Sequence, residues 1–564
     1  MERFAKYSNI ADRSALLEKI RNKRKDYRNE KPLLEIRPLV KQENRVFHVK
    51  YQSLDSFMRD QELENYLVIT APGTYTAVLD KLMGKHACIY VADSKKETLE
   101  NVQRLYDETV EHQKRAGANG MLPAEYIQQE GTLDIASIEA VVCLGGGVAM
   151  DAGKFISSHI GVPLYAVPTV LSVNAAFCYK AALRERDIFN TQEVAYNVVY
   201  KFFGLPEAIC IDLDIITAEK QLAAAAEYQG KPEAESALFI WNILRELNIA
   251  GAGDLLSILT ATMDWEINHL VARDLRVPDK NFPNDPNARE LLEKPFSQDV
   301  CIGARELLSL LDQHAEEIRF GKKEGIEFMA RAYHWIAEQS WIMQHTMWES
   351  ASEHGMFDHF ENLAGTELTH GTVIALCVYF MSLLQINQHE RAVQMIRRLG
   401  VNISLADLAI NAANNDKITP LTLFDCLVDL KAYIEEINYR YTIISAKPIT
   451  TEWVFEALEK YYQDFYSDLD AQGIVMTKEK ELSSGMKLTE KESKRQEAVL
   501  AKMRKDLQQH QEAMRAAYVA EAKMRQEVEA VFASKESSVQ EKLDARERIL
   551  KAKADAYRAY FTVA

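Results

Sequence analysis

Short hydrophobic runs alternate with helical stretches between residues 61 and 215. In chain order the runs are YLVIT, ACIYVAD, EAVVCLG, PLYAVPT and AICIDLD. This alternation is typical of βαβ units, which assemble into a parallel sheet. The pattern therefore predicts an α/β domain over residues 61–215, with a ligand expected beyond the carboxyl ends of the strands.

The chain before and after this region follows other patterns. Residues 1–60 are charged and helix-leaning, which predicts an N-terminal helical extension. Their basic cluster RNKRKDYR is interpreted as a solvated helix face, with a phosphate or lipid contact as the alternative. Residues 216–477 show long apolar periodicities and almost no strand signal, so we expect an all-helical domain there.

The last part, residues 478–564, is rich in Glu, Lys, Gln, Arg and Ala and carries a narrow apolar stripe. Such a stripe predicts a coiled coil or a helical hairpin, with ASKESS at 533–538 as the turn. Packing on its own domain and assembly with another chain both remain open. His510 and Glu521 interrupt the stripe, whose members are Leu500, Met503, Leu507, Met514, Ala517, Met524, Val528 and Val531.

A glycine-rich turn follows one of the predicted strands. The sequence VVCLGGGVAMDAGKF places Gly145, Gly146 and Gly147 between a strand and a helix. Glycine allows sharp bends and close approach of a ligand, and a helix N-terminus attracts phosphate through its unpaired N–H groups. The turn is therefore a candidate pyrophosphate site, although it lacks the GxGxxG spacing.

Acidic and histidine residues gather in two later segments of the chain. AGAGDLLSILTATMDW contains Asp254 and Asp264, and ESASEHGMFDHFENLAGTELTHGTV contains His354, His359 and His370. A carboxylate with two imidazoles suits Zn²⁺, Fe²⁺ or Ni²⁺, and three protein ligands leave positions for water or substrate. The alternative for each histidine alone is a capping or surface role.

The order of these motifs resembles the metal-dependent polyol dehydrogenase superfamily. This superfamily includes glycerol dehydrogenase, iron-containing alcohol dehydrogenases, sn-glycerol-1-phosphate dehydrogenase and, more remotely, dehydroquinate synthase. The AGxGDLL, DW and SEH elements are most similar to the glycerol-1-phosphate dehydrogenase group. The resemblance implies a dehydroquinate synthase-like α/β fold with an N-terminal dinucleotide-binding domain and a helical metal-binding domain, to which this chain adds a helical C-terminal extension.

The resemblance also implies roles for individual residues. Asp254, His354 and His370 correspond to the three metal ligands, and His359 and Asn174 are the candidate catalytic residues. The cofactor is NAD or NADP, and the metal is Zn²⁺, with Fe²⁺ or Ni²⁺ as alternatives. The cofactor-binding positions are Asp93, Gly145, Gly146, Gly147, Asp151, Lys154, Thr169 and Ser172.

Several positions depart from the family pattern. Asn174 stands where the family usually has an aspartate, and His359 follows His354 by five residues instead of four. Thr372 replaces a glutamate, and about 30 residues lie between AICIDLD and Asp254, which is more than the family normally has. The expected function is interconversion of a polyol or polyol phosphate and its ketone. The alternatives are a repurposed or weakly active member with an interaction role and a dehydroquinate-synthase-like cyclase.

Composition narrows the expected setting of the protein. The formal net charge of −16 argues against general nucleic-acid binding. Seven scattered cysteines without a CxxC pair suit a reducing compartment, and the N-terminus lacks a signal-peptide pattern. We therefore expect a cytoplasmic enzyme that does not span a membrane. We also expect a homo-oligomer, in which the tail is a candidate for assembly.

Overall fold

The residues that the computed structural model describes form two compact units. Among the described residues, those within 48–358 and 369–402 form the sheet unit, and those within 359–368 and 403–562 form the hairpin unit. Each unit is considered by itself. The described ranges are 48–70, 88–91, 138–178, 180–186, 196–202, 206–217, 232–274, 296–343, 345–365, 368–412, 415–436, 441–466 and 490–562.

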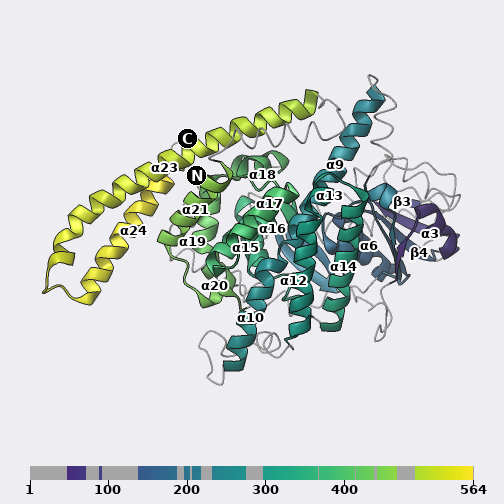
Figure 1. The fold of residues 1–564 in the computed structure, drawn as a ribbon, viewed down its shortest axis with the longest axis horizontal. Coiled ribbons are helices and arrows are strands. Elements are labelled where there is room, and N and C mark those ends of the chain that lie inside the picture. The colour runs from purple at the N-terminus through teal and green to yellow at the C-terminus, as the bar shows by residue number, and fades with distance from the viewer. Residues whose placement is uncertain are drawn as a thin grey trace. The chain divides into compact units, whose positions relative to one another are not determined.

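A six-stranded parallel sheet lies in the sheet unit (Figure 1). Its order is β1-β8-β5-β4-β2-β3, and every neighbouring pair is parallel. The predicted α/β fold class is confirmed, because all five hydrophobic runs contain a strand. The strands are β1 (Val49–Tyr51), β2 (Tyr66–Thr70), β3 (Cys88–Val91), β4 (Ala140–Gly145), β5 (Leu164–Pro168) and β8 (Ala208–Ile211).

Two features of the strand pattern differ from the sequence prediction. β1 is an edge strand within the stretch predicted as a helical extension, residues 1–60. A separate antiparallel pair joins β6 (Lys180–Arg186) to β7 (Tyr196–Phe202). β6 has the sequence KAALRER, whose charged residues hide the strand from a search for apolar runs.

Helices surround and follow the sheet. β2, β4, β5 and β8 are buried throughout, as expected for parallel strands covered on both faces. α15 (Ser352–Ala364) begins in the sheet unit and ends in the hairpin unit. The other helices of the sheet unit are α3 (Leu54–Gln61), α6 (Gly147–Ile160), α7 (Leu213–Ile216), α9 (Pro232–Leu255), α10 (Ile258–Asp274), α12 (Gln298–Gln313), α13 (Ala315–Arg319), α14 (Lys323–Met343), α16 (His370–Gln385) and α17 (His389–Leu399).

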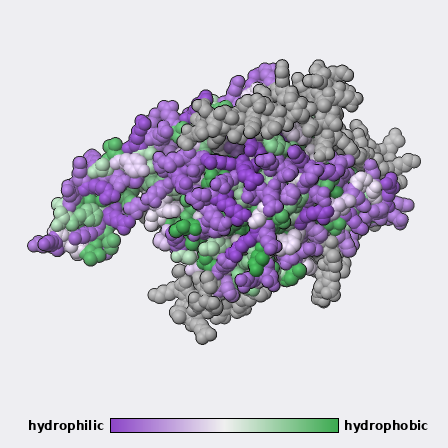
Figure 2. Space-filling view, viewed as in Figure 1, coloured by the Kyte–Doolittle hydropathy of each residue, from purple (hydrophilic) through white to green (hydrophobic). Residues whose placement is uncertain are grey.

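The hairpin unit is helical in its described part. Two long helices, α23 and α24, pack side by side and are joined at residues 534–538, the predicted turn (Figure 1). Hydrophilic residues predominate on their visible face (Figure 2). The described α-helices of this unit are α18 (Leu405–Asn411), α19 (Pro420–Glu436), α20 (Ile443–Ala446), α21 (Thr451–Phe465), α23 (Glu490–Ala533) and α24 (Val539–Thr562).

The hairpin packs against other helices of its own unit. α18 contacts α23, and α21 contacts α24. The two polar interruptions of the apolar stripe take part in this packing: His510 is buried against Tyr462, and Glu521 lies 2.8 Å from the Lys553 Nζ of α24. Participation of the tail in assembly stays a prediction.

None of the helices in the described ranges is both long enough and apolar enough to cross a membrane.

Candidate metal centre and cofactor site

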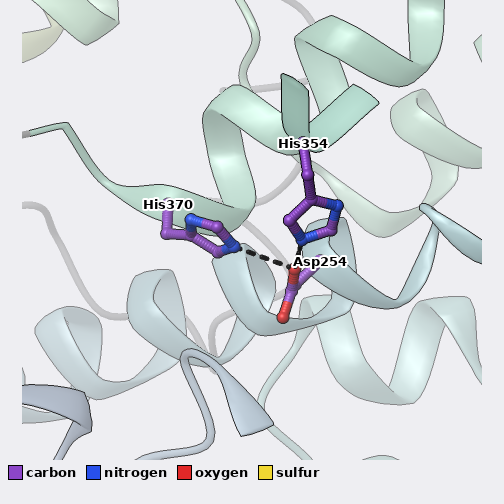
Figure 3. A group of neighbouring side chains, drawn as sticks. All are labelled: Asp254, His354 and His370. Atoms are coloured by element: carbon purple, nitrogen blue, oxygen red, sulfur yellow. Dashed lines mark ion pairs between the residues drawn. The ribbon is translucent and has the colours of Figure 1, made fainter. Parts of the chain in front are cut away.

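Three side chains from three helices of the sheet unit converge (Figure 3). Asp254 lies near the end of α9, His354 in the first turn of α15, and His370 at the start of α16. One potential ligand atom from each lies within 4.8 Å of the others. The Nε2 atom of His370 is 3.2 Å, and that of His354 is 3.7 Å, from Asp254 Oδ1. The structure thus brings the three predicted metal ligands together.

Glycines allow the helices that carry these side chains to touch. A Cβ atom at Gly371 would lie 1.8 Å from the Ala250 carbonyl oxygen, and one at Gly253 would lie 2.4 Å from the Gly371 carbonyl oxygen. The backbones of α9 and α16 are therefore in direct contact, beside Asp254 and His370. A Cβ at Gly251 would lie 1.7 Å from the Leu171 carbonyl oxygen, so α9 also touches the segment after β5.

Buried carboxylates organise the start of α15. Asp264 Oδ2 accepts a hydrogen bond from the Ser352 backbone N–H at 3.1 Å. Glu353 Oε1 lies 2.9 Å from His354 Nδ1, and its Oε2 accepts from Thr260 Oγ1 at 2.7 Å. Glu353 is part of the SEH element but was not among the predicted site residues; its signal in the sequence was its place in that element, immediately before a candidate ligand.

The electrostatic surroundings favour an ionised carboxylate at Asp254. Burial by itself raises the pKa of Asp254, but the adjacent His370 and His354 imidazoles lower it, and the net pKa is below its usual value. Burial, with the nearby Asp254 and Glu349 carboxylates, raises the pKa of Tyr333 well above its ordinary value. Tyr333 therefore keeps its proton, which it donates to the Gly251 carbonyl at 2.8 Å.

The glycine turn lies at the carboxyl ends of β4 and β5, where Gly145 pairs with Pro168. Gly145 has φ 154°, a value that residues with side chains rarely adopt. Gly146 precedes α6, whose N-terminus has no side-chain cap. A Cβ at Gly146 would lie 3.1 Å from Val170 Cγ1. The turn therefore offers backbone N–H groups at the position expected for a phosphate.

The remaining predicted cofactor residues have different surroundings. Asp151 and Lys154 are buried in α6 and form an ion pair of 2.9 Å with each other. The Thr169 backbone N–H donates to the Gly145 carbonyl at 3.0 Å, which holds the residue beside the turn. Ser172 Oγ lies 3.8 Å from the Cβ position of Gly146. Asp93 lies outside the described residues.

His359, a predicted catalytic residue, belongs to the hairpin unit. Its Nε2 lies 3.2 Å from Asp429 Oδ2, and its ring stacks on Tyr433 with 4.3 Å between centroids. The structure therefore does not group it with the metal-ligand candidates. Asn174, the other predicted residue, lies in the sheet unit and its amide donates to Glu349 Oε2 at 3.5 Å.

Comparisons with known proteins agree with the resemblance seen in the motifs. Residues 50–218 match the family described as iron-containing alcohol dehydrogenase. The glycerol-1-phosphate dehydrogenase [NAD(P)+] of Aeropyrum pernix is 25% identical over 315 residues, covering 56% of this chain and 71% of the relative. The protein of the same name from Halalkalibacterium halodurans is 22% identical over 311 residues, covering 53% and 62%.

A solved structure, glycerol dehydrogenase from Schizosaccharomyces pombe, is 14% identical with a TM-score of 0.46, covering 76% of this chain and 93% of that one. The family match and the curated relatives confirm that this chain is similar to the metal-dependent polyol dehydrogenase superfamily, and to its glycerol-1-phosphate dehydrogenases.

Proposed function

We propose that this protein is an NAD(P)- and metal-dependent dehydrogenase that interconverts a polyol phosphate of the glycerol 1-phosphate type and its ketone. The observation that carries the proposal is the convergence of Asp254, His354 and His370 within one unit. The same unit holds the glycine turn at the carboxyl ends of β4 and β5. Two curated relatives named glycerol-1-phosphate dehydrogenase support the choice of substrate.

The three converging side chains fit a divalent cation. One carboxylate and two imidazoles form a mixed oxygen and nitrogen donor set, and Asp254 supplies a negative charge that partly offsets the cation. We assign the site to Zn²⁺ first, with Fe²⁺ or Ni²⁺ as alternatives. A cation held there would supply Lewis-acid polarisation of the reacting substrate oxygen, and a bound NAD(P) would supply the hydride acceptor or donor.

The chain's own residues position the reactants. The N–H groups at the start of α6 would bind the pyrophosphate, since no side chain caps them and neither Gly145 nor Gly146 carries a Cβ. Asn174 and Glu349 are candidates to orient a substrate hydroxyl, because the amide donates and the carboxylate accepts hydrogen bonds. Proton transfer by His359 remains a secondary proposal.

A coupled test of metal content and turnover would decide the function. Purified protein should contain about one divalent metal per chain and oxidise NADH or NADPH with dihydroxyacetone phosphate. Glycerol 1-phosphate should be oxidised in the reverse direction in preference to glycerol 3-phosphate or glycerol. Asp254→Asn serves as the matched inactive variant. Metal and cofactor binding without turnover on these substrates would favour the repurposed alternative.

A further inference from the structure

Glu353 is the residue immediately before the candidate ligand His354. Its side chain is fully buried, with 0% exposed, and a buried carboxylate needs hydrogen-bond donors. Oε1 accepts from the Ala351 backbone N–H at 2.6 Å and lies 2.9 Å from His354 Nδ1. Oε2 accepts from Thr260 Oγ1 at 2.7 Å. Contacts on both oxygens therefore hold the carboxylate in one orientation.

The contact with Glu353 determines which nitrogen of His354 carries hydrogen. An ionised carboxylate only accepts hydrogen bonds, so the hydrogen between the two residues belongs on Nδ1. The lone pair of a neutral imidazole is then on Nε2, the atom that lies 3.7 Å from Asp254 Oδ1. A metal ligand needs this lone pair.

We propose that Glu353 is a positioning residue, which fixes the Nδ1–H tautomer and ring orientation of His354 and so presents Nε2 to a divalent cation. The inference rests on the proposed function, because the cation is the one assigned to Asp254, His354 and His370. Carboxylates that accept from a ligating histidine also increase the basicity of the imidazole, and losing such a partner typically weakens metal binding 10–100-fold.

The chain offers a matched control for the loss of a buried carboxylate. Asp264 holds the start of the same helix, but its bond to α15 is from the Ser352 backbone N–H. Asp264→Asn and Glu353→Gln both replace a buried carboxylate with an amide of the same shape. Only the second change removes the charge that faces His354.

Co²⁺ binding to the full-length protein would test the proposal, with affinity measured by competition against a chromophoric chelator. We expect Glu353→Gln to lower Co²⁺ affinity by roughly tenfold or more and to change the visible spectrum of bound Co²⁺. Asp264→Asn should keep the wild-type affinity. Thr260→Val, which removes a donor to Glu353 but keeps the charge, should give a smaller decrease. Melting of the metal-free proteins verifies that each variant folds.

Three other outcomes would contradict the proposal, and each would do so in a different way. Wild-type Co²⁺ affinity in folded Glu353→Gln protein would overturn the positioning role and leave the metal site intact. Equal losses in Glu353→Gln and Asp264→Asn, with equally lowered melting temperatures, would also overturn it, since they would show a purely structural effect. Wild-type affinity in His354→Ala protein would overturn the metal site itself and the inference with it.

Discussion

Both units place a histidine beside a carboxylate at the same distance. His370 Nε2 lies 3.2 Å from Asp254 Oδ1 in the sheet unit, and His359 Nε2 lies 3.2 Å from Asp429 Oδ2 in the hairpin unit. A single histidine–carboxylate pair therefore does not distinguish a candidate metal centre from ordinary packing.

The partners of the imidazole rings distinguish the candidate metal centre of the sheet unit from the histidine packing of the hairpin unit. In the sheet unit a second imidazole, from His354, faces the same carboxylate. In the hairpin unit the histidine rings stack on tyrosines: His359 on Tyr433, and His510 on Tyr462 with 3.9 Å between centroids. A ring face covered by an aromatic ring contributes to packing, whereas converging ring nitrogens provide a donor set.

The largest expected effect is loss of metal from one unit only. His370→Ala removes a donor, so metal affinity should fall by at least two orders of magnitude. His359→Ala should keep about one metal per chain, because Asp429 and Tyr433 are its partners. Elemental analysis after dialysis would measure both. If His359→Ala lost the metal and His370→Ala kept it, the comparison between the units would be reversed.

The next effect concerns the hairpin unit. Tyr557 of α24 is fully buried, and its ring packs against those of Phe424 and Phe455. Tyr557→Ala should lower the free energy of unfolding of this unit by about 3–5 kcal/mol, because the lost ring leaves a cavity. Metal binding should be unchanged. Chemical denaturation followed by circular dichroism would measure the loss.

Tyr557→Phe is the control for that change, because it retains the ring and removes only the hydroxyl, which lies 3.4 Å from His510 Nδ1. Its effect should be about 1 kcal/mol. Equal effects of the two variants would contradict a role for ring packing.

A smaller effect is expected at the glycine turn. A Cβ at Gly146 would already lie 3.1 Å from Val170 Cγ1, and a branched side chain would also occupy the space offered to a pyrophosphate. Gly146→Val should weaken NADH binding by about tenfold, or about 1.4 kcal/mol. Gly146→Ala should have a weaker effect. Fluorescence titration of folded variants would measure affinity, and an unchanged value for Gly146→Val would remove the turn from the cofactor site.

A pH dependence is also expected, confined to the hairpin unit. Burial raises the pKa of Asp506 to about 7, against the opposing charges of Lys502 and Lys505. The unfolded carboxyl ionises near about 3.9, so stability is lost as pH rises from there through about 7. Asp506→Asn should remove this contribution. The melting temperatures of the wild type and of Asp506→Asn, plotted against pH over that range, should converge at low pH. Two parallel plots would contradict the assignment.

The sequence predicted those features that depend on local pattern. β2 was visible because YLVIT is a continuous apolar run, and Asp254, His354 and His370 were visible by residue type and order. The role of Glu353 could not be predicted from the sequence, because it depends on the contacts of Thr260 and Ala351 with the two carboxylate oxygens.

Helix geometry explains the unexpected partners of His359. Five residues turn a helix through about 500°, which places His359 about 140° around α15 from His354. The unusual spacing therefore indicated another face of the helix, but only the tertiary structure identified Asp429 and Tyr433 there.

The contact between α9 and α16 affects the order of events during folding. The backbones of the two helices meet at Ala250 and Gly371, which are distant in sequence. Asp254 is likewise distant in sequence from both histidine ligands. Closing such loops costs entropy before any contact forms. A cation therefore cannot nucleate this site from a short local segment, as zinc does in small finger domains. We expect added metal to slow unfolding of the sheet unit much more than it accelerates folding.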